Sequence, residues 1–344
     1  LNLVPLRHGE SFKDAMDAMV RLAKRVEDLG YTRYWIAEHH NMRSIASSAT
    51  QLLIQHTLAN TKKIRVGSGG VMLPNHSPYL IAEQYGTLET LYPNRVDLGL
   101  GRAPGTDVPT AMALRRTKDL KTDFERDLAE LLGYFKGSNY VQAYPAHGLY
   151  LPFYILGSST DSAYLAAKLG LPYSFAAHFA PTMMENAIAI YNRYFQPSAI
   201  LDKPYVILGV NAILADTDEE AKRLSTTMIQ SFLNIVTSNQ KGLMPPLQSE
   251  EAVWREFIAT NKVPHFGPIA FEVDNLISHE KEIVEKMTKV SFIGSKGSVA
   301  KQIKDLQKRV KFEELIVNSY IYDEEAQYHS YKLLAEVIEE NFKE

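Results

Sequence analysis

The chain has 344 residues, of which 45% are hydrophobic, and its formal net charge is −3. This size and composition are typical of a globular protein with one large domain or two ordinary ones. The interspersed charges argue against a nucleic-acid surface, and no apolar run reaches the roughly 18 residues of a membrane span. The sequence has no cysteine, which excludes disulfides, thiolate metal sites and a cysteine nucleophile. Because the first residues also lack the pattern of an export signal, we expect a cytoplasmic protein.

The first hundred residues alternate short apolar runs with amphipathic segments. We expect strands at residues 1–6, 34–37, 64–69 and 96–100, and helices at residues 12–29, 48–59 and 77–91. Ser11 is placed to cap the first helix, Gly30 to end it, and Pro78 to open the third. Regular alternation of this kind predicts parallel strands joined by right-handed crossovers.

The rest of the chain continues the alternation after a polar segment, residues 106–126, which we expect to be a solvated loop leading into a helix. Further strands are expected at 153–156, 173–176, 205–214 and 314–319, with helices at 160–169, 181–195, from about 216, and at 324–342. Eight such units predict an α/β fold of the (βα)₈ TIM barrel type, as a single domain over residues 1–344. A bare barrel needs about 250 residues. We place the surplus in an insertion at about 237–296, between strands seven and eight, as a lid or a structural extension.

The strand at 96–100 leads into a loop that carries Arg102. Ligands of barrel enzymes bind at the carboxyl ends of the strands, and a guanidinium there is suited to holding phosphate or carboxylate. The alternative is a solvated surface arginine. Pro104 stands where a dinucleotide-binding glycine motif needs its third glycine, so the loop is not a Rossmann turn.

Glu38, His39 and His40 follow the second expected strand. Adjacent residues of an extended segment point to opposite faces, so the three side chains cannot all bind one metal. A zinc site would need a further ligand, and the candidates are His8, His76 and His178. We favour one histidine that faces the barrel mouth and one that is structural, with no metal.

Two glycines, Gly69 and Gly70, end the third strand. They allow backbone conformations closed to other residues and let a flat group approach the main chain, although an ordinary bulge is the simpler alternative. Hydroxyl residues from Ser158 to Ser162 open the helix after strand five. A helix N-terminus with hydroxyls is suited to phosphate, and plain N-capping is the alternative. Together with Arg102, these features predict a pocket for a planar phosphorylated cofactor such as FMN.

The same residues resemble those of the bacterial luciferase-like, flavin-dependent monooxygenases. The resemblance rests on the motifs 34–40, 66–74, 95–105 and 157–162, followed by Leu169-Gly170-Leu171-Pro172, and it runs over nearly the whole chain. Met244-Pro245-Pro246 and Ile321-Tyr322-Asp323 resemble a single-chain subgroup of that family. The resemblance implies a (βα)₈ barrel with reduced FMN at the carboxyl-terminal mouth.

Site residues follow from the motif positions. Arg102, Ser159 and Ser162 would hold the FMN phosphate, and Gly69-Gly70 match a non-proline cis peptide beneath the isoalloxazine ring. His39 matches the catalytic histidine near the reactive edge of the flavin, whereas the resemblance gives no role to Glu38. Gly101 stands where luciferases have a reactive cysteine, so light emission is not expected.

The family resemblance also implies the reaction and its partners. Reduced FMN and O₂ would form a flavin hydroperoxide that oxygenates a small organic substrate, with His39 as acid or base. A separate flavin reductase would supply the reduced FMN, and we expect a homodimer. The alternatives are a hydride-transferring reductase that uses FMN or a deazaflavin, a flavin-binding protein without turnover, and a metal-dependent barrel hydrolase.

Overall fold

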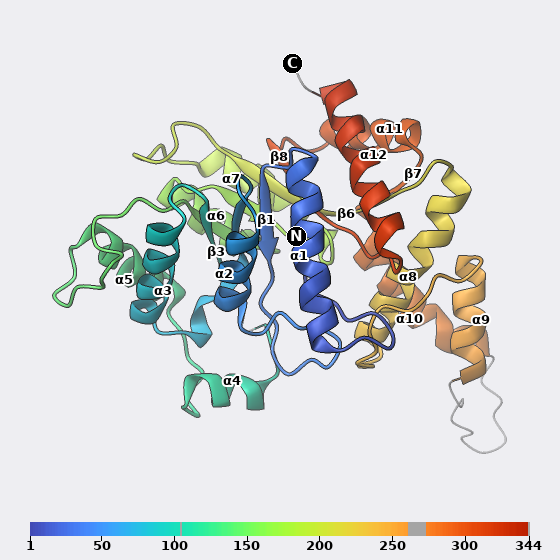
Figure 1. Cartoon of the computed structure of the whole chain (residues 1–344), viewed down its shortest axis with the longest axis horizontal. Coiled ribbons are helices and arrows are strands. Elements are labelled where there is room, and N and C mark those ends of the chain that lie inside the picture. Colours follow the sequence, from blue (N-terminus) through green and yellow to red (C-terminus); the bar gives the residue numbers. More distant parts are fainter. Residues whose placement is uncertain (104, 261–272, 343–344) are drawn as a thin grey trace.

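The computed structural model describes the whole chain except residues 104, 261–272 and 343–344. An eight-stranded parallel sheet runs through the molecule, and helices surround it (Figure 1). The strands are β1 (Arg33–Ile36), β2 (Arg65–Met72), β3 (Val96–Gly101), β4 (Phe153–Gly157), β5 (Tyr173–Phe175), β6 (Val206–Leu214), β7 (Ser291–Gly294) and β8 (Glu314–Asn318). Strands β1 to β6 pair in sequence order, as right-handed strand–helix units require.

The sheet closes on itself through the first residues of the chain. The backbone nitrogen of Leu1 donates to Val317 O in β8 at 2.8 Å. On the other side, Asn2 forms a parallel bridge with Ile36 of β1. Residues 1–4 therefore stand between the last strand and the first, and the fold is a barrel of the TIM type.

The helices follow the expected alternation. They are α1 (Phe12–Asp28), α2 (Thr50–Asn60), η1 (Leu73–Asn75), α3 (Pro78–Leu91), α4 (Val108–Arg115), α5 (Phe124–Lys136), α6 (Thr160–Leu169), η2 (Pro181–Met183), α7 (Met184–Tyr194), α8 (Asp218–Val236), α9 (Glu250–Thr260), α10 (Val273–Thr288), α11 (Lys296–Gln307) and α12 (Glu324–Phe342). Ser11 caps α1 in a reciprocal capping box with Asp14, and Gly30 follows it with φ of +79°. Among the described residues, no helix is long and apolar enough to cross a membrane.

Two elements differ from the sequence prediction. The segment 1–6 makes only isolated bridges in place of a continuous strand, because Val4 has φ of +52° and its N–H bonds to the Asn2 side chain at 2.6 Å. Residues 106–126, expected as a loop, contain the short helix α4, which Asp107 caps by accepting from Thr110 N. An N-cap aspartate directly before Val108-Pro109 was a helix signal that the charged composition of the segment masked.

The segment 237–296 contains more regular structure than an insertion loop. It holds α9, α10 and β7, while residues 261–272 within it lie outside the described part. Strand β7 pairs with the carboxyl-terminal half of β6, Asn211–Leu214, whereas β8 pairs with Ile207–Asn211. The long strand β6 thus serves both β8 of the barrel and β7 of the added segment.

A buried ion cluster lies at the amino-terminal ends of the barrel strands. The fully buried carboxylate of Asp97 accepts from Arg33 Nη1 at 2.6 Å, Arg65 Nη2 at 2.6 Å and Trp35 Nε1 at 3.0 Å. Arg33 also bonds Glu314 of β8 at 2.7 Å. Satisfied on several sides, this cluster ties β1, β2, β3 and β8 together at one end of the barrel.

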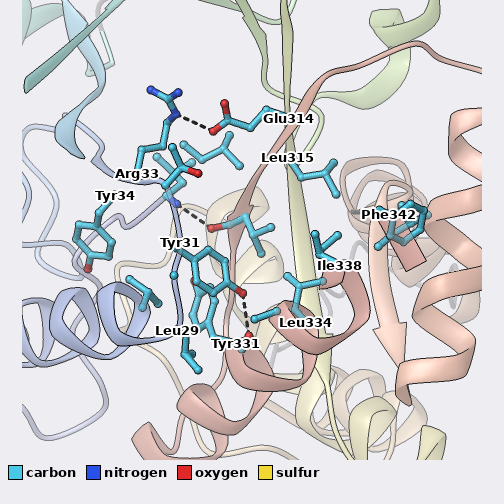
Figure 2. A pocket seen from close by; sticks show the side chains of 18 of the residues that line it. Leu29, Tyr31, Arg33, Tyr34, Glu314, Leu315, Tyr331, Leu334, Ile338 and Phe342 are labelled. Carbon is cyan, nitrogen blue, oxygen red and sulfur yellow. Dashed lines mark hydrogen bonds and ion pairs between the residues drawn. The ribbon is translucent and has the colours of Figure 1, made fainter. Parts of the chain in front are cut away.

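A cavity of about 380 Å³ lies beside this cluster, between β1, β8 and α12 (Figure 2). Tyr31, Arg33, Glu314 and Tyr331 line it, and Tyr31 donates its hydroxyl to Tyr331 O at 2.8 Å. Arg33 and Glu314 are the first residues of β1 and β8, so the cavity lies at the amino-terminal ends of the strands. The cavity is therefore separate from the carboxyl-terminal mouth, where the candidate site residues lie.

Candidate active site at the barrel mouth

The loops that follow β1 and β3 pack against each other at the mouth. Thr106 Oγ1 donates to His40 O at 3.3 Å, and Asn41 Nδ2 donates to Asp107 Oδ2 at 2.8 Å. Gly105, with φ of +62°, lies so close that an added Cβ would be 3.2 Å from Glu38 O. The loop that carries Arg102 and the loop that carries His39 thus form one wall of the site.

His39 is half-buried in this wall, and its backbone N–H donates to Ser47 O at 3.1 Å. Burial lowers the pKa of its imidazole below the usual range, although a hydrogen bond with the Gly105 backbone and the charge of Glu38 oppose this effect. The ring is therefore neutral at pH 7. A neutral imidazole can accept a proton, which is what a general base requires.

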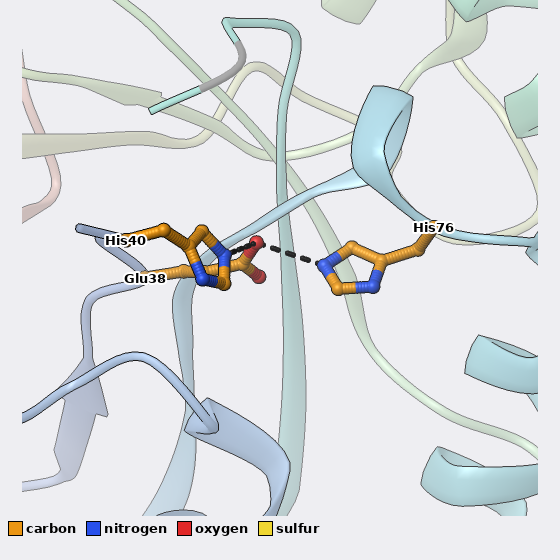
Figure 3. A group of neighbouring side chains, drawn as sticks. All are labelled: Glu38, His40 and His76. Atoms are coloured by element: carbon orange, nitrogen blue, oxygen red, sulfur yellow. Dashed lines mark hydrogen bonds and ion pairs between the residues drawn. The ribbon is translucent and has the colours of Figure 1, made fainter. Parts of the chain in front are cut away.

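Glu38 and His40, two residues apart in this loop, meet His76 from the loop after β2 (Figure 3). His40 Nε2 lies 3.0 Å from Glu38 Oε1, and His76 Nε2 lies 2.8 Å from the same oxygen. The donor atoms of the three residues lie within 4.8 Å of one another, a set that could hold a metal ion. The two short distances are those of hydrogen bonds to one carboxylate oxygen. These two hydrogen bonds hold the three side chains together.

The other two histidines considered as ligands lie elsewhere. His8 N donates to Leu243 O, away from this group. His178 follows β5, its backbone oxygen accepts from Asn211 Nδ2 at 2.7 Å, and burial lowers its pKa to about 3.

The Gly69–Gly70 peptide is cis, as the family resemblance implies. The pairing of β2 with β3 also shifts register between Ser68 and Val71, so the bulge expected as the alternative is present as well. A Cβ on Gly70 would come within 2.8 Å of Gly99 O, and a Cβ on Gly69 within 2.8 Å of the Leu1 side chain. Larger residues do not fit here without displacing the neighbours.

Arg102 lies at the end of β3 and reaches the first turn of α6. Its Nη2 is 3.2 Å from Asp161 Oδ2, and the two side chains are 50% and 68% exposed. The structure therefore brings Arg102 to the serine-rich helix start that the sequence placed opposite it. Asp161 was not identified as a partner, since nothing in a local pattern links residues on different strands.

The start of α6 leaves the Ser159 hydroxyl available. Ser159 is the N-cap residue, yet its side chain makes no capping hydrogen bond. The buried Ser162 instead donates its hydroxyl to Ser159 O at 2.8 Å and lies 3.1 Å from Tyr173 OH. The proton of Ser162 is thus already used, whereas Ser159 and the free N–H groups of the first turn can face an anion.

A sequence profile of the family described as luciferase-like monooxygenase matches residues 3–310. A luciferase-like monooxygenase of Escherichia coli is 42% identical, with 99% of this chain and 96% of the relative aligned. The N-acetyl-S-alkylcysteine monooxygenase of Bacillus subtilis is 30% identical over 82% of this chain and 85% of its own length.

Solved structures agree with this assignment. The crystal structure of apo-MsnO8 superposes with a TM-score of 0.83 at 31% identity and covers 98% of this chain and 96% of MsnO8. Both the family match and the fold extend over nearly the whole chain, and they confirm the resemblance seen in the motifs. The protein belongs to the luciferase-like monooxygenase family and is an oxidoreductase of the monooxygenase class.

Proposed function

We propose that this protein binds reduced FMN at the carboxyl-terminal mouth of the barrel and uses O₂ to oxygenate a small organic substrate. The observation that carries the proposal is the meeting of Arg102 with the first turn of α6, where the Ser159 hydroxyl makes no capping bond. A cation, a free hydroxyl and unpaired N–H groups together suit a phosphate monoester. The residues present therefore fit the phosphate end of FMN.

The rest of the pocket also suits a flavin. The Gly69–Gly70 backbone has no side chains to obstruct a flat ring, and neighbouring atoms exclude larger residues there. His39 supplies a neutral imidazole from the adjacent loop. Reduced flavin supplies the electrons that activate O₂, while the chain positions the ring, keeps water out and provides an acid or base.

Related proteins support the choice of cofactor and partner. A 3,6-diketocamphane monooxygenase component with the same fold was solved in complex with FMN, at 17% identity and a TM-score of 0.65. The trigonelline monooxygenase relative, 23% identical, is described as an oxygenase component. We extend both properties to this chain as a proposal: FMN is its flavin, and a separate reductase delivers it in reduced form.

The surface of α2 and α3 supports a homodimer. Leu52 on α2 and Leu80 and Leu91 on α3 are 72%, 53% and 59% exposed. Tyr144 and Tyr150, in the segment after α5 that packs on α3, are each 67% exposed. These helices lie next to each other in Figure 1. We infer that these exposed apolar side chains on neighbouring elements are covered by a second copy of the chain.

One alternative keeps the fold and changes the chemistry. An F420-dependent secondary alcohol dehydrogenase has the same fold at 14% identity and a TM-score of 0.62, so hydride transfer with a deazaflavin is compatible with the barrel. A flavin-binding protein without turnover is a second alternative. Uptake of O₂ separates both from a monooxygenase.

The experiment is an anaerobic titration of the purified protein with reduced FMN, followed by rapid mixing with oxygenated buffer. We expect saturable binding and a transient absorbance that differs from both oxidised and reduced flavin. The decay of that transient then serves as a screen for substrates. Binding without the transient would favour the reductase or the carrier, and failure to bind reduced FMN would refute the proposal.

A further inference from the structure

The carboxylate of Glu38 lies between two imidazole rings that come from different loops (Figure 3). Its Oε1 is 3.0 Å from His40 Nε2 and 2.8 Å from His76 Nε2, and its Oε2 accepts from Met72 N at 3.2 Å. The side chain is buried. All three donors thus hydrogen-bond to one buried carboxylate.

The chemistry of these bonds determines where the protons are. Burial alone would raise the pKa of Glu38, but the hydrogen bonds from His40 and His76 outweigh it and lower the pKa to about 2. An ionised carboxylate only accepts hydrogen bonds, so each Nε2 must carry a hydrogen. In a neutral ring, Nδ1 is then the acceptor.

Each Nδ1 is available. Among the described residues, neither His40 Nδ1 nor His76 Nδ1 has a hydrogen-bond partner, and neither belongs to the buried unpaired atoms. The two side chains are 11% and 22% exposed. The rings stand at the ends of loops that follow adjacent strands, β1 and β2, in the same mouth as His39. Their free nitrogens can therefore be reached by a bound molecule.

We propose that Glu38 is a positioning residue that holds His40 and His76 as Nε2–H tautomers, so that the Nδ1 atom of each ring is an acceptor subsite for an N–H or O–H group of a bound ligand. The tautomer assignment stands on the hydrogen bonds alone. Its catalytic consequence rests on the proposed function. The donor group belongs to the reduced flavin or to the substrate, and the two sources give different results below.

The first test uses the protein without flavin. In protein carrying ¹⁵N-labelled histidine, the nitrogen shifts distinguish Nε2–H from Nδ1–H rings, and assignment uses Glu38→Gln, His40→Gln and His76→Gln. Among the ten histidines of the chain, we expect the rings of His40 and His76 to be Nε2–H in the wild type, and both signals to be perturbed in Glu38→Gln. An Nδ1–H ring at either position would overturn the proposal, and so would zinc or iron at one ion per chain in the wild type that is lost in Glu38→Gln.

The second test separates position from function. Glutamine at position 76 keeps an N–H donor for Glu38 but has no ring acceptor, whereas His76→Phe loses both. If the ligand group belongs to flavin, His76→Gln weakens reduced-FMN binding at least about tenfold, the loss expected for one good hydrogen bond. If the ligand group belongs to the substrate, the affinity for reduced FMN is unchanged and the rate of substrate-dependent oxidation falls about tenfold.

The acceptor subsite would be overturned if His76→Gln left three quantities unchanged. These are the thermal midpoint, the affinity for reduced FMN and the rate of oxidation of a substrate found in the screen. Absence of reduced-FMN binding in the wild type would refute the proposed function and leave the tautomer result standing. The two failures are therefore distinguishable.

Discussion

Arg102 and Asp161 form an ion pair between the ends of the neighbouring strands β3 and β4, with 3.2 Å between Nη2 and Oδ2. The two residues are on the loop after β3 and in the first turn of α6. Both are at least half exposed, and exposed ion pairs contribute little net energy. A phosphate could therefore displace Asp161 from Arg102 at low cost.

This pair predicts opposite effects for its two members. Arg102→Ala removes a charge-assisted contact with phosphate and should weaken reduced-FMN binding by about 1.5–3 kcal/mol. Asp161→Asn frees the guanidinium and removes a negative charge, so it should strengthen binding. Anaerobic titration measures both dissociation constants. Equal affinities in the wild type and Arg102→Ala would remove Arg102 from the site.

Crowding at the glycine pair predicts a graded response. In Gly70→Ala the new methyl group would meet the Gly99 carbonyl, which is fixed in β3, and we expect a loss of about 1–3 kcal/mol in unfolding free energy. Gly69→Ala first meets the movable end of Leu1 and should cost less. Chemical denaturation of both variants is the measurement. A fully stable Gly70→Ala that binds FMN normally would contradict the close approach described above.

Glu38→Gln should destabilise the protein in a pH-dependent manner. We expect a loss of about 2–4 kcal/mol at neutral pH, because a buried anion with two imidazole donors is replaced by an amide. The pKa of Glu38 is about 2 in the folded protein against 4.5 ordinarily. Its stabilisation is therefore complete above about pH 4.5 and is lost as the pH falls toward 2. Urea unfolding of the wild type and variant at several pH values should show a gap that narrows on acidification.

His39 provides a test of role rather than of binding. His39→Ala should leave the affinity for reduced FMN nearly unchanged while it abolishes product or shortens the life of the oxygen-derived transient. Because burial lowers its pKa, the ring should titrate below 6.5 in an NMR measurement on the wild type. Oxygenation at the full wild-type rate in His39→Ala would make the residue structural.

The apolar face on α2 and α3 predicts a change in assembly. Leu52→Glu and Leu91→Glu should convert a dimer to monomers in sedimentation experiments, since each places a charge in the proposed interface. Tyr194→Glu is a matched control on α7, where the side chain is 47% exposed. A wild-type protein that sediments as a monomer would refute the homodimer.

Much of the fold could be predicted from local patterns. The apolar runs gave the barrel strands after residue 30, and capping residues such as Ser11 and Gly30 marked the helix ends. Two features depended on contacts far along the chain. Residues 1–4 close the ring through their contacts with β1 and β8. The four residues of β7 form a strand because β6 extends beyond its pairing with β8.

The site shows the same division. Positions at strand ends singled out Arg102, the two glycines and the start of α6, since strand ends converge in a barrel. The family resemblance then implied His39, Gly69, Gly70, Ser159 and Ser162 as site residues, and their roles stay predictions. No role was predicted for Glu38, because its partner His76 follows a different strand. The Arg102–Asp161 pair was missed for the same reason. Side-chain pairing between neighbouring strands depends on register, which local patterns do not specify.

Ring closure through residues 1–4 has a consequence for biosynthesis. Leu1 bonds Val317, which lies 316 residues along the chain, so this segment waits for β8 before it reaches its native neighbour in that strand. Until then residues 1–4 pair only with β1, and the part of β6 that pairs with β8, residues 207–210, has an open edge. Unpaired edges invite association with other chains. We expect nascent chains truncated before β8 to depend on chaperones, and the completed barrel to form late and cooperatively.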